Sequence, residues 1–167
     1  MPTGPAARVT DNVVHPLPPV LSPGPGSPNV LIGGLPAWRG VPLAAVAALQ
    51  AAKTAADIAI NTAVAATAAA AGTPGAPAAK AAEEATKTAA LSAMSSAITT
   101  AAGSGADIHS CTTPLPAPPH GPGVVITGSA TVMINNLPAC RMGDTLLEAV
   151  GPPNTITKGE MTVIIGG

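Results

Sequence analysis

The fold of this chain is decided by the stretch Gly128-Ser129-Ala130-Thr131-Val132-Met133-Ile134-Asn135-Asn136, followed after one residue by Pro138-Ala139-Cys140-Arg141-Met142-Gly143-Asp144. Val132 and Ile134 are two residues apart, which is the period of a strand with one face inward. Asn135-Asn136 can adopt positive φ and form a tight hairpin turn, and the Pro that follows restricts φ. The Arg of the second segment can then lie outward or pair with the Asp three residues later.

The same order of residues occurs three times along the chain. Each unit reads Pro-Ala-x-Arg, an Asp, a Pro-rich loop and Gly-x-x-x-Val-x-Ile, and the units cover 5–34, 36–136 with an interruption, and 138–167. One such unit is too small to bury its own apolar face, so three units are expected to share one narrow core. The sequence therefore predicts a mainly β fold, a small β-prism of three repeat units.

Residues 41–106 interrupt the second unit between its Arg39 and its Asp107. The segment is rich in Ala, the best helix former, and Pro42 and Pro77 suit the first turns of helices. Between them, 72–75 is a Gly-Thr-Pro-Gly break. We expect an inserted Ala-rich α-helical hairpin with helices near 43–71 and 77–102, while 1–40 and 107–167 form the β-prism.

The hairpin contains few large apolar side chains, and Leu91, Met94 and Ile98 share one helix face. Its uncharged stretches consist of Ala, Thr, Ser and Gly rather than Leu, which disfavours a membrane-spanning hairpin. We expect it to be soluble or to lie on a surface.

Four residues are candidate metal ligands: His15, His109, Cys111 and His120. Three imidazoles and one thiolate suit tetrahedral Zn²⁺, and a shell supplied wholly by the protein indicates a structural site. His-x-Cys spacing alone is a weak signal, but the repeat places His15 and the 109–120 segment in equivalent loops of neighbouring units. His15 could instead be a plain loop histidine, and Cys111 with His109 could be a nucleophile and its base.

Two further residues complete the expectations for this region. Glu148, in the loop of the third unit, is expected to be a solvated charge, because that loop contains no His. Cys140 is expected to be a small buried residue.

Composition excludes several classes of function. Trp38 is the only aromatic residue, the net charge is −1, and charged residues make up 9% of the chain, so the basic face of a nucleic-acid-binding protein is missing. The N-terminal segment has no apolar core of a secretory signal. The serines lack a nucleophile elbow and no phosphate-binding loop is present, which indicates a protein that is not an enzyme.

With the repeat and the ligands in view, the chain resembles the PAAR-repeat proteins. Pro5-Ala6-Ala7-Arg8 spells the family's name, and Pro36-Ala37-Trp38-Arg39 and Pro138-Ala139-Cys140-Arg141 are variants of it. The resemblance covers 5–40 and 107–167, and the pattern around 137–144 is similar to that of a PAAR-like subgroup. The inserted hairpin departs from a minimal PAAR protein.

The resemblance implies a cone-shaped PAAR fold with a zinc ion near its tip, the family's ligands falling on His15, His109, Cys111 and His120. It also implies a spike-tip protein, one copy on the trimeric β-helical spike of a contractile injection system such as type VI secretion, a phage tail or a related particle. The spike would be of the valine-glycine-repeat or phage-tail type. Such a tip sharpens the spike for piercing a membrane, touches the target membrane transiently and can attach effectors.

These implications place the protein in the cytoplasm during assembly and then outside the cell as part of the particle. An alternative remains open, in which the hairpin acts as an effector or toxin, or as an adaptor for cargo or a chaperone.

Overall fold

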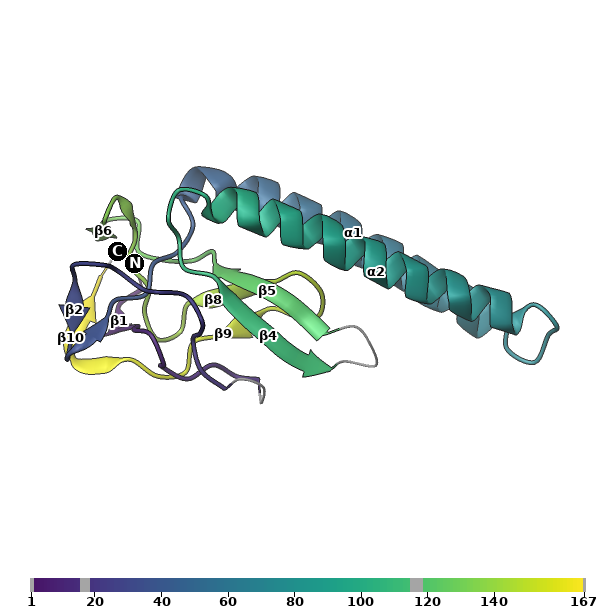
Figure 1. Cartoon of the computed structure of the whole chain (residues 1–167), viewed down its shortest axis with the longest axis horizontal. Coiled ribbons are helices and arrows are strands. Elements are labelled where there is room, and N and C mark those ends of the chain that lie inside the picture. Colours follow the sequence, from purple (N-terminus) through teal and green to yellow (C-terminus); the bar gives the residue numbers. More distant parts are fainter. Residues whose placement is uncertain (1, 16–18, 115–118, 167) are drawn as a thin grey trace.

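A computed structural model describes residues 2–15, 19–114 and 119–166, and within them the chain forms short strands and two long helices. Figure 1 shows the strands gathered in one body, with the helices along one side of it. The helices are α1 (Leu43–Ala69) and α2 (Ala76–Ala102). The strands are β1 (Gly4–Ala6), β2 (Leu31–Ile32), β3 (Leu35–Pro36), β4 (His109–Pro114), β5 (Pro119–Val125), β6 (Met133–Ile134), β7 (Leu137–Pro138), β8 (Thr145–Glu148), β9 (Asn154–Thr155) and β10 (Glu160–Ile165).

The three Pro-Ala-x-Arg segments hydrogen-bond to one another in a closed ring. The amide of Ala7 donates to the carbonyl of Cys140 at 2.9 Å, that of Cys140 to Trp38 at 3.1 Å, and that of Trp38 to Ala7 at 2.9 Å. All three residues are buried in one cluster, so the prediction that Cys140 is a small buried residue is confirmed. The Ala before each of them packs in a second cluster with the last Ile of each Val-x-Ile segment: Ile32, Ile134 and Ile165.

Each Arg of the ring is buried and paired with a buried Asp, so the outward orientation of the Arg is excluded. The Nη2 atoms of Arg8, Arg39 and Arg141 lie 3.0, 2.9 and 3.1 Å from carboxylate oxygens of their partners. Two of the pairs are local in sequence, with Asp11 and Asp144, whereas the partner of Arg39 is Asp107. The Arg–Asp pairs of the three units, called the three corners of the ring below, therefore have the same contacts. In one corner the two helices are inserted between the Arg and the Asp.

Two tight hairpins follow the Val-x-Ile segments, as expected. β2 pairs with β3 through Gly33 and Gly34 at φ 56° and 83°, and β6 pairs with β7 through Asn135 and Asn136 at φ 53° and 63°. The third Val-x-Ile segment lies in β10 and pairs with β1. In all three segments the Ile is buried and the residue before it is exposed, namely Leu31, Met133 and Ile164.

The helices cover one face of the four-stranded antiparallel sheet β4-β5-β8-β9. Met94 and Ile98 of α2 are buried against Val124 of β5 and Leu147 of β8, in a cluster that Leu49 of α1 joins. This docking uses the apolar face expected for α2. Without the helices these sheet side chains would face water.

Beyond this contact the helices continue past the ends of β4 and β5, so that the turn between them is the part of the chain farthest from β2, β6 and β10 (Figure 1). Among the described residues, one helix, α1, is long and apolar enough to cross a membrane, by length and composition only. One such helix is weak support for insertion, because core helices share this composition.

Candidate metal centre

Three strands and one loop bring buried polar side chains together on the four-stranded sheet. His109 and Cys111 lie two residues apart on β4, so their side chains share one face of the strand. His120 lies at the start of β5 and Glu148 ends β8. In the register of the sheet Gly123 of β5 lies between His109 and Glu148, and a Cβ atom there would stand 3.0 Å from Glu148 Cγ. The glycine leaves room for the carboxylate side chain.

The ligand atoms of His15, His109, Cys111 and Glu148 all lie within 4.8 Å of one another, and the four residues are buried. The Nε2 atoms of His15 and His109 are 2.7 Å apart. Glu148 Oε1 lies 3.1 Å from His15 Nε2 and 3.9 Å from His109 Nε2. These atoms converge on one point, which is the arrangement that a bound metal ion needs.

His120 lies beside this group rather than in it. Its Nδ1 is 2.5 Å from Glu148 Oε2, and its ring centroid is 6.4 Å from that of His15, against 4.8 Å between His15 and His109. Its buried Nε2 has no hydrogen-bond partner among the described residues. Of the four residues singled out in the sequence, three belong to the mutually close group, and Glu148 is its fourth member.

The expectation that Glu148 is a solvated charge is wrong, because its side chain is 0% exposed. Strand β8 pairs with β5 and carries Glu148 into the interior, where Asn154 Nδ2 donates to its Oε1 at 3.0 Å. A signal was present in the sequence: the residue is the one charge in the apolar run 146–150. A single carboxylate in an otherwise apolar run favours burial over exposure to water.

Burial favours the neutral form of His15 and of His109, because it lowers the pKa of both. Desolvation, with the neighbouring His15 adding to it, lowers the pKa of His109 to about 4. Desolvation also lowers the pKa of His15, with the charge of Glu148 opposing it. Neutral imidazole is the form that binds metals, because its free nitrogen lone pair is the ligand.

The carboxylate of Glu148 points to a cation at this place. Buried charges in proteins are paired or coordinate metals. Within the part of the chain that the structure describes, the basic side chains within 4 Å of the Glu148 carboxylate are the three histidines, and no Lys or Arg forms an ion pair with it. Two imidazoles, a thiol and a carboxylate are a set of donors that fits a metal ion, so the cluster could bind one.

Comparison with known families gives one match, to a model described as PAAR motif, over residues 105–167. This segment carries a PAAR motif. No curated protein and no solved structure matches the chain.

The matched segment contains the third Pro-Ala-x-Arg segment and four of the five polar side chains of the centre, namely His109, Cys111, His120 and Glu148. His15 and the first two Pro-Ala-x-Arg segments lie before it. Since the ring closes through Ala7 and Trp38, the matched segment is completed in space by the N-terminal residues.

Proposed function

We propose that the β part of this protein is a cone-shaped prism of three repeat units that caps the trimeric spike of a contractile injection system. The observation that carries the proposal is the closed ring, because its three backbone hydrogen bonds run in a cycle through the three units, as a threefold arrangement requires. A threefold trimer and a threefold base present matching surfaces to each other. A single chain with three equivalent corners is thereby suited to sit on a trimer.

Exposed apolar side chains near the ring indicate which end of the protein would contact the spike. Leu31, Met133 and Ile164 hold the same position in their units and are 64%, 49% and 59% exposed. Figure 1 places their strands β2, β6 and β10 at one end of the protein, together with both termini, while β4 and β5 run toward the other end. Exposed apolar side chains gathered in this way mark contact surfaces. We assign this end as the face that docks on the spike.

We further propose that the metal is a structural zinc ion near the narrow end, and that the protein is not an enzyme. His15, His109 and Cys111 would be ligands, with His120 or Glu148 as the fourth. A shell with four protein ligands leaves no position for substrate. The ion would link the loop of His15 to β4 and so stiffen an end that has little apolar core. A stiff narrow end concentrates the force of contraction on a target membrane.

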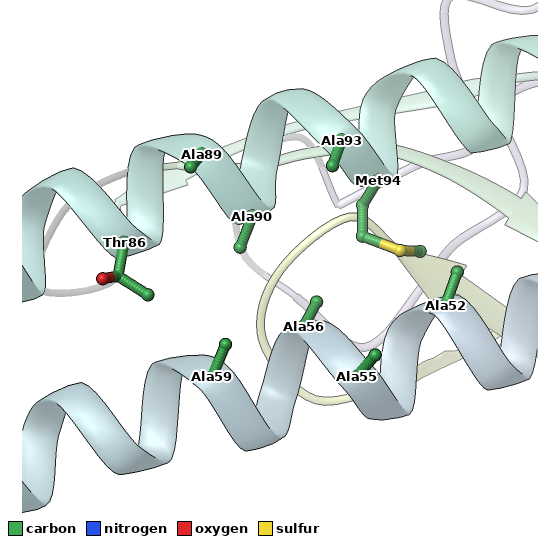
Figure 2. Close-up of a pocket in the computed structure, with 9 residues that line it drawn as sticks. All are labelled: Ala52, Ala55, Ala56, Ala59, Thr86, Ala89, Ala90, Ala93 and Met94. Carbon is green, nitrogen blue, oxygen red and sulfur yellow. The ribbon is translucent and has the colours of Figure 1, made fainter.

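In this scheme the chain assembles on the spike in the cytoplasm and leaves the cell with the particle. The helices add a second candidate role, attachment of effector or chaperone. A specific observation favours it: Figure 2 shows a groove between α1 and α2 into which small side chains from both helices point. The groove is lined by Ala52, Ala55, Ala56, Ala59, Thr86, Ala89, Ala90, Ala93 and Met94.

Two measurements on the full chain test the main proposal. Elemental analysis of protein purified without added metal should find about one zinc per chain, lost in His15→Ala and in Cys111→Ser. Cys140→Ala is the matched control, since it removes the other cysteine and should keep the zinc. Co-sedimentation with a purified trimeric spike should follow a 1:1 ratio of chain to trimer. Absence of zinc would overturn the metal part, and absence of binding would overturn the capping role.

A further inference from the structure

We propose that the uncharged end of the helical pair, residues 66–79, is the part of this protein that first contacts a target membrane, and that it enters the interface of the lipid bilayer. The inference rests on the capping role proposed above. It assigns the leading position to the turn between α1 and α2 and not to the end of the strands. The docking face lies at the opposite end of the protein and the helices extend past β4 and β5, so this turn would reach a membrane first (Figure 1).

The end of the helical pair differs in composition from an ordinary water-exposed turn. Residues 66–79 are Ala, Gly, Thr and Pro, without a charged side chain among them. None of them is buried. Exposed segments of soluble proteins usually carry charged side chains, which keep them in water. A charged side chain has to be desolvated when it enters a bilayer, and this end avoids that cost.

Many polar groups of this end are hydrogen-bonded within the chain. The amide of Ala70 donates to the carbonyl of Ala66 at 3.0 Å, and that of Thr73 donates to the carbonyl of Ala70 at 3.0 Å. The hydroxyl of Thr73 donates to the same carbonyl at 2.7 Å, and Pro74 and Pro77 have no N–H. Inside a bilayer no water is available to backbone groups, so internal hydrogen bonds are a condition for entry. The turn meets much of this condition while it is still in water.

A group of charged side chains lies directly behind the uncharged end. Lys80 follows it on α2, and its Nζ lies 2.9 Å from Glu83 Oε1 and 2.8 Å from Glu84 Oε1. The Lys80 side chain is 54% exposed, so it can contact lipid phosphates while the end lies deeper. Residues 76–79 add about 6 Å of helix to the turn. This length suits the roughly 5–10 Å to which interfacial segments enter, and it is too short for the roughly 30 Å of a membrane span.

The same composition disfavours a protein as the partner of this end. Contacts between proteins draw most of their binding energy from large side chains that fill a pocket, especially Trp, Tyr and Arg. Residues 66–79 contain nothing larger than Thr and Pro. Contact with a bilayer scales with the apolar area that enters it and needs no matching pocket. Because Ala and Pro bury little area the contact is weak at rest, and contraction of the particle would supply the force that drives it.

A fluorescent label that responds to polarity tests the inference on the full-length protein. Ala71→Cys places the label in the turn, and Ser92→Cys, exposed on α2 behind the charged group, is the control. Cys111 and Cys140 are buried and should not react. With an excess of phosphatidylcholine–phosphatidylglycerol vesicles, emission from the label at position 71 should shift to shorter wavelength and be quenched by lipids brominated near the headgroups. No shift at position 71, or the same shift at both positions, would overturn the inference.

A charge placed in this end provides a second test. Ala78→Asp, introduced into the variant labelled at position 71, adds a carboxylate to the first turn of α2, where it favours the helix. The spectral shift should be lost, whereas Ser92→Asp should leave it unchanged. Persistence of the shift in Ala78→Asp would contradict entry of this end into the bilayer. Both experiments are carried out without a spike, so their failure would leave the capping role standing, and failure of binding to the trimer would remove the leading position but not the contact with lipid.

Discussion

Arg39 and Asp107 are 68 residues apart in the sequence, yet Arg39 Nε lies 3.0 Å from Oδ2 of Asp107 and Nη2 lies 2.9 Å from Oδ1. The amide of Asp107 also donates to the carbonyl of Arg39 at 3.0 Å. The chain therefore leaves the β part at Arg39 and, after the two helices, returns to it at Asp107, directly beside the place where it left. The long insertion separates two residues that are three apart in the other corners, without changing their contact.

Breaking this pair should destabilise the protein. Asp107 is 0% exposed, so Asp107→Asn leaves the guanidinium of Arg39 buried without a full counter-charge. We expect a loss of about 3–5 kcal/mol in the free energy of unfolding. Urea unfolding followed by the fluorescence of Trp38, the only aromatic side chain, measures it. Asp144→Asn, at the local pair, should cost a similar amount; a loss below about 1 kcal/mol for Asp107→Asn would contradict the role given to the pair.

The Gly that begins each Gly-x-x-x-Val-x-Ile segment is required by close packing. A Cβ on Gly128 would lie 2.8 Å from Pro138 Cβ, and one on Gly26 would lie 2.6 Å from Pro36 Cβ. Gly128→Ala should therefore lower stability by about 1–3 kcal/mol in the same urea experiment. Gly75→Ala is the control, because its nearest neighbour would be 3.5 Å away and its φ is −80°. Equal effects of the two substitutions would show that packing against the Pro is not the cause.

Charge placed on the docking face should prevent binding to a spike without unfolding the protein. Met133→Asp and Ile164→Asp alter side chains that are 49% and 59% exposed, so stability should change by no more than about 0.5 kcal/mol. Co-sedimentation with the trimer should be lost in both. Ile58→Asp, 61% exposed on α1, is the matched control and should bind as the wild type does. Loss of binding in all three variants would show that the effect is not confined to this face.

Lowering the pH should destabilise the packing of α1 on α2 around Glu83. Hydrogen bonds from Lys87, then from Lys80 and Thr67, lower the pKa of this buried carboxyl from 4.5 to about 2. Because the pKa is depressed in the folded state, the contribution is complete above about pH 4.5 and is lost as the pH falls toward 2. Far-ultraviolet circular dichroism across this range should show a loss of helix that is smaller in Glu83→Gln. An identical acid transition in the variant would assign it to other groups.

Much of the local structure could be predicted, because it depends on short-range rules. The hairpin turns follow from Gly33-Gly34 and Asn135-Asn136, which tolerate positive φ. The helices begin and end at 43–69 and 76–102, against 43–71 and 77–102 expected, because Pro and Gly mark their ends. The burial of Cys140 could be predicted because a free Cys behaves as a small apolar residue.

The remainder depends on contacts between distant segments. Glu148 is buried because β8 pairs with β5, a pairing between segments that lie apart in the sequence. The docking of α2 brings Leu91 next to Gly121, which has φ +78°, and a Cβ built on this glycine would lie 2.6 Å from Leu91 Cδ1. Spacing along the chain brought His120 into the predicted ligand set but left out Glu148, whose Oε2 lies 2.5 Å from His120 Nδ1.

The threefold ring has a consequence for imaging. If the protein caps a threefold trimer as proposed, it can bind in three rotational settings of almost equal energy, whereas the helical pair occurs once and lies along one side of the strands (Figure 1). Particles would then be a mixture of three rotational settings of the protein on the spike. Averaging with imposed threefold symmetry would spread the helices over three positions at about a third of full density each. Only classification without symmetry would recover them.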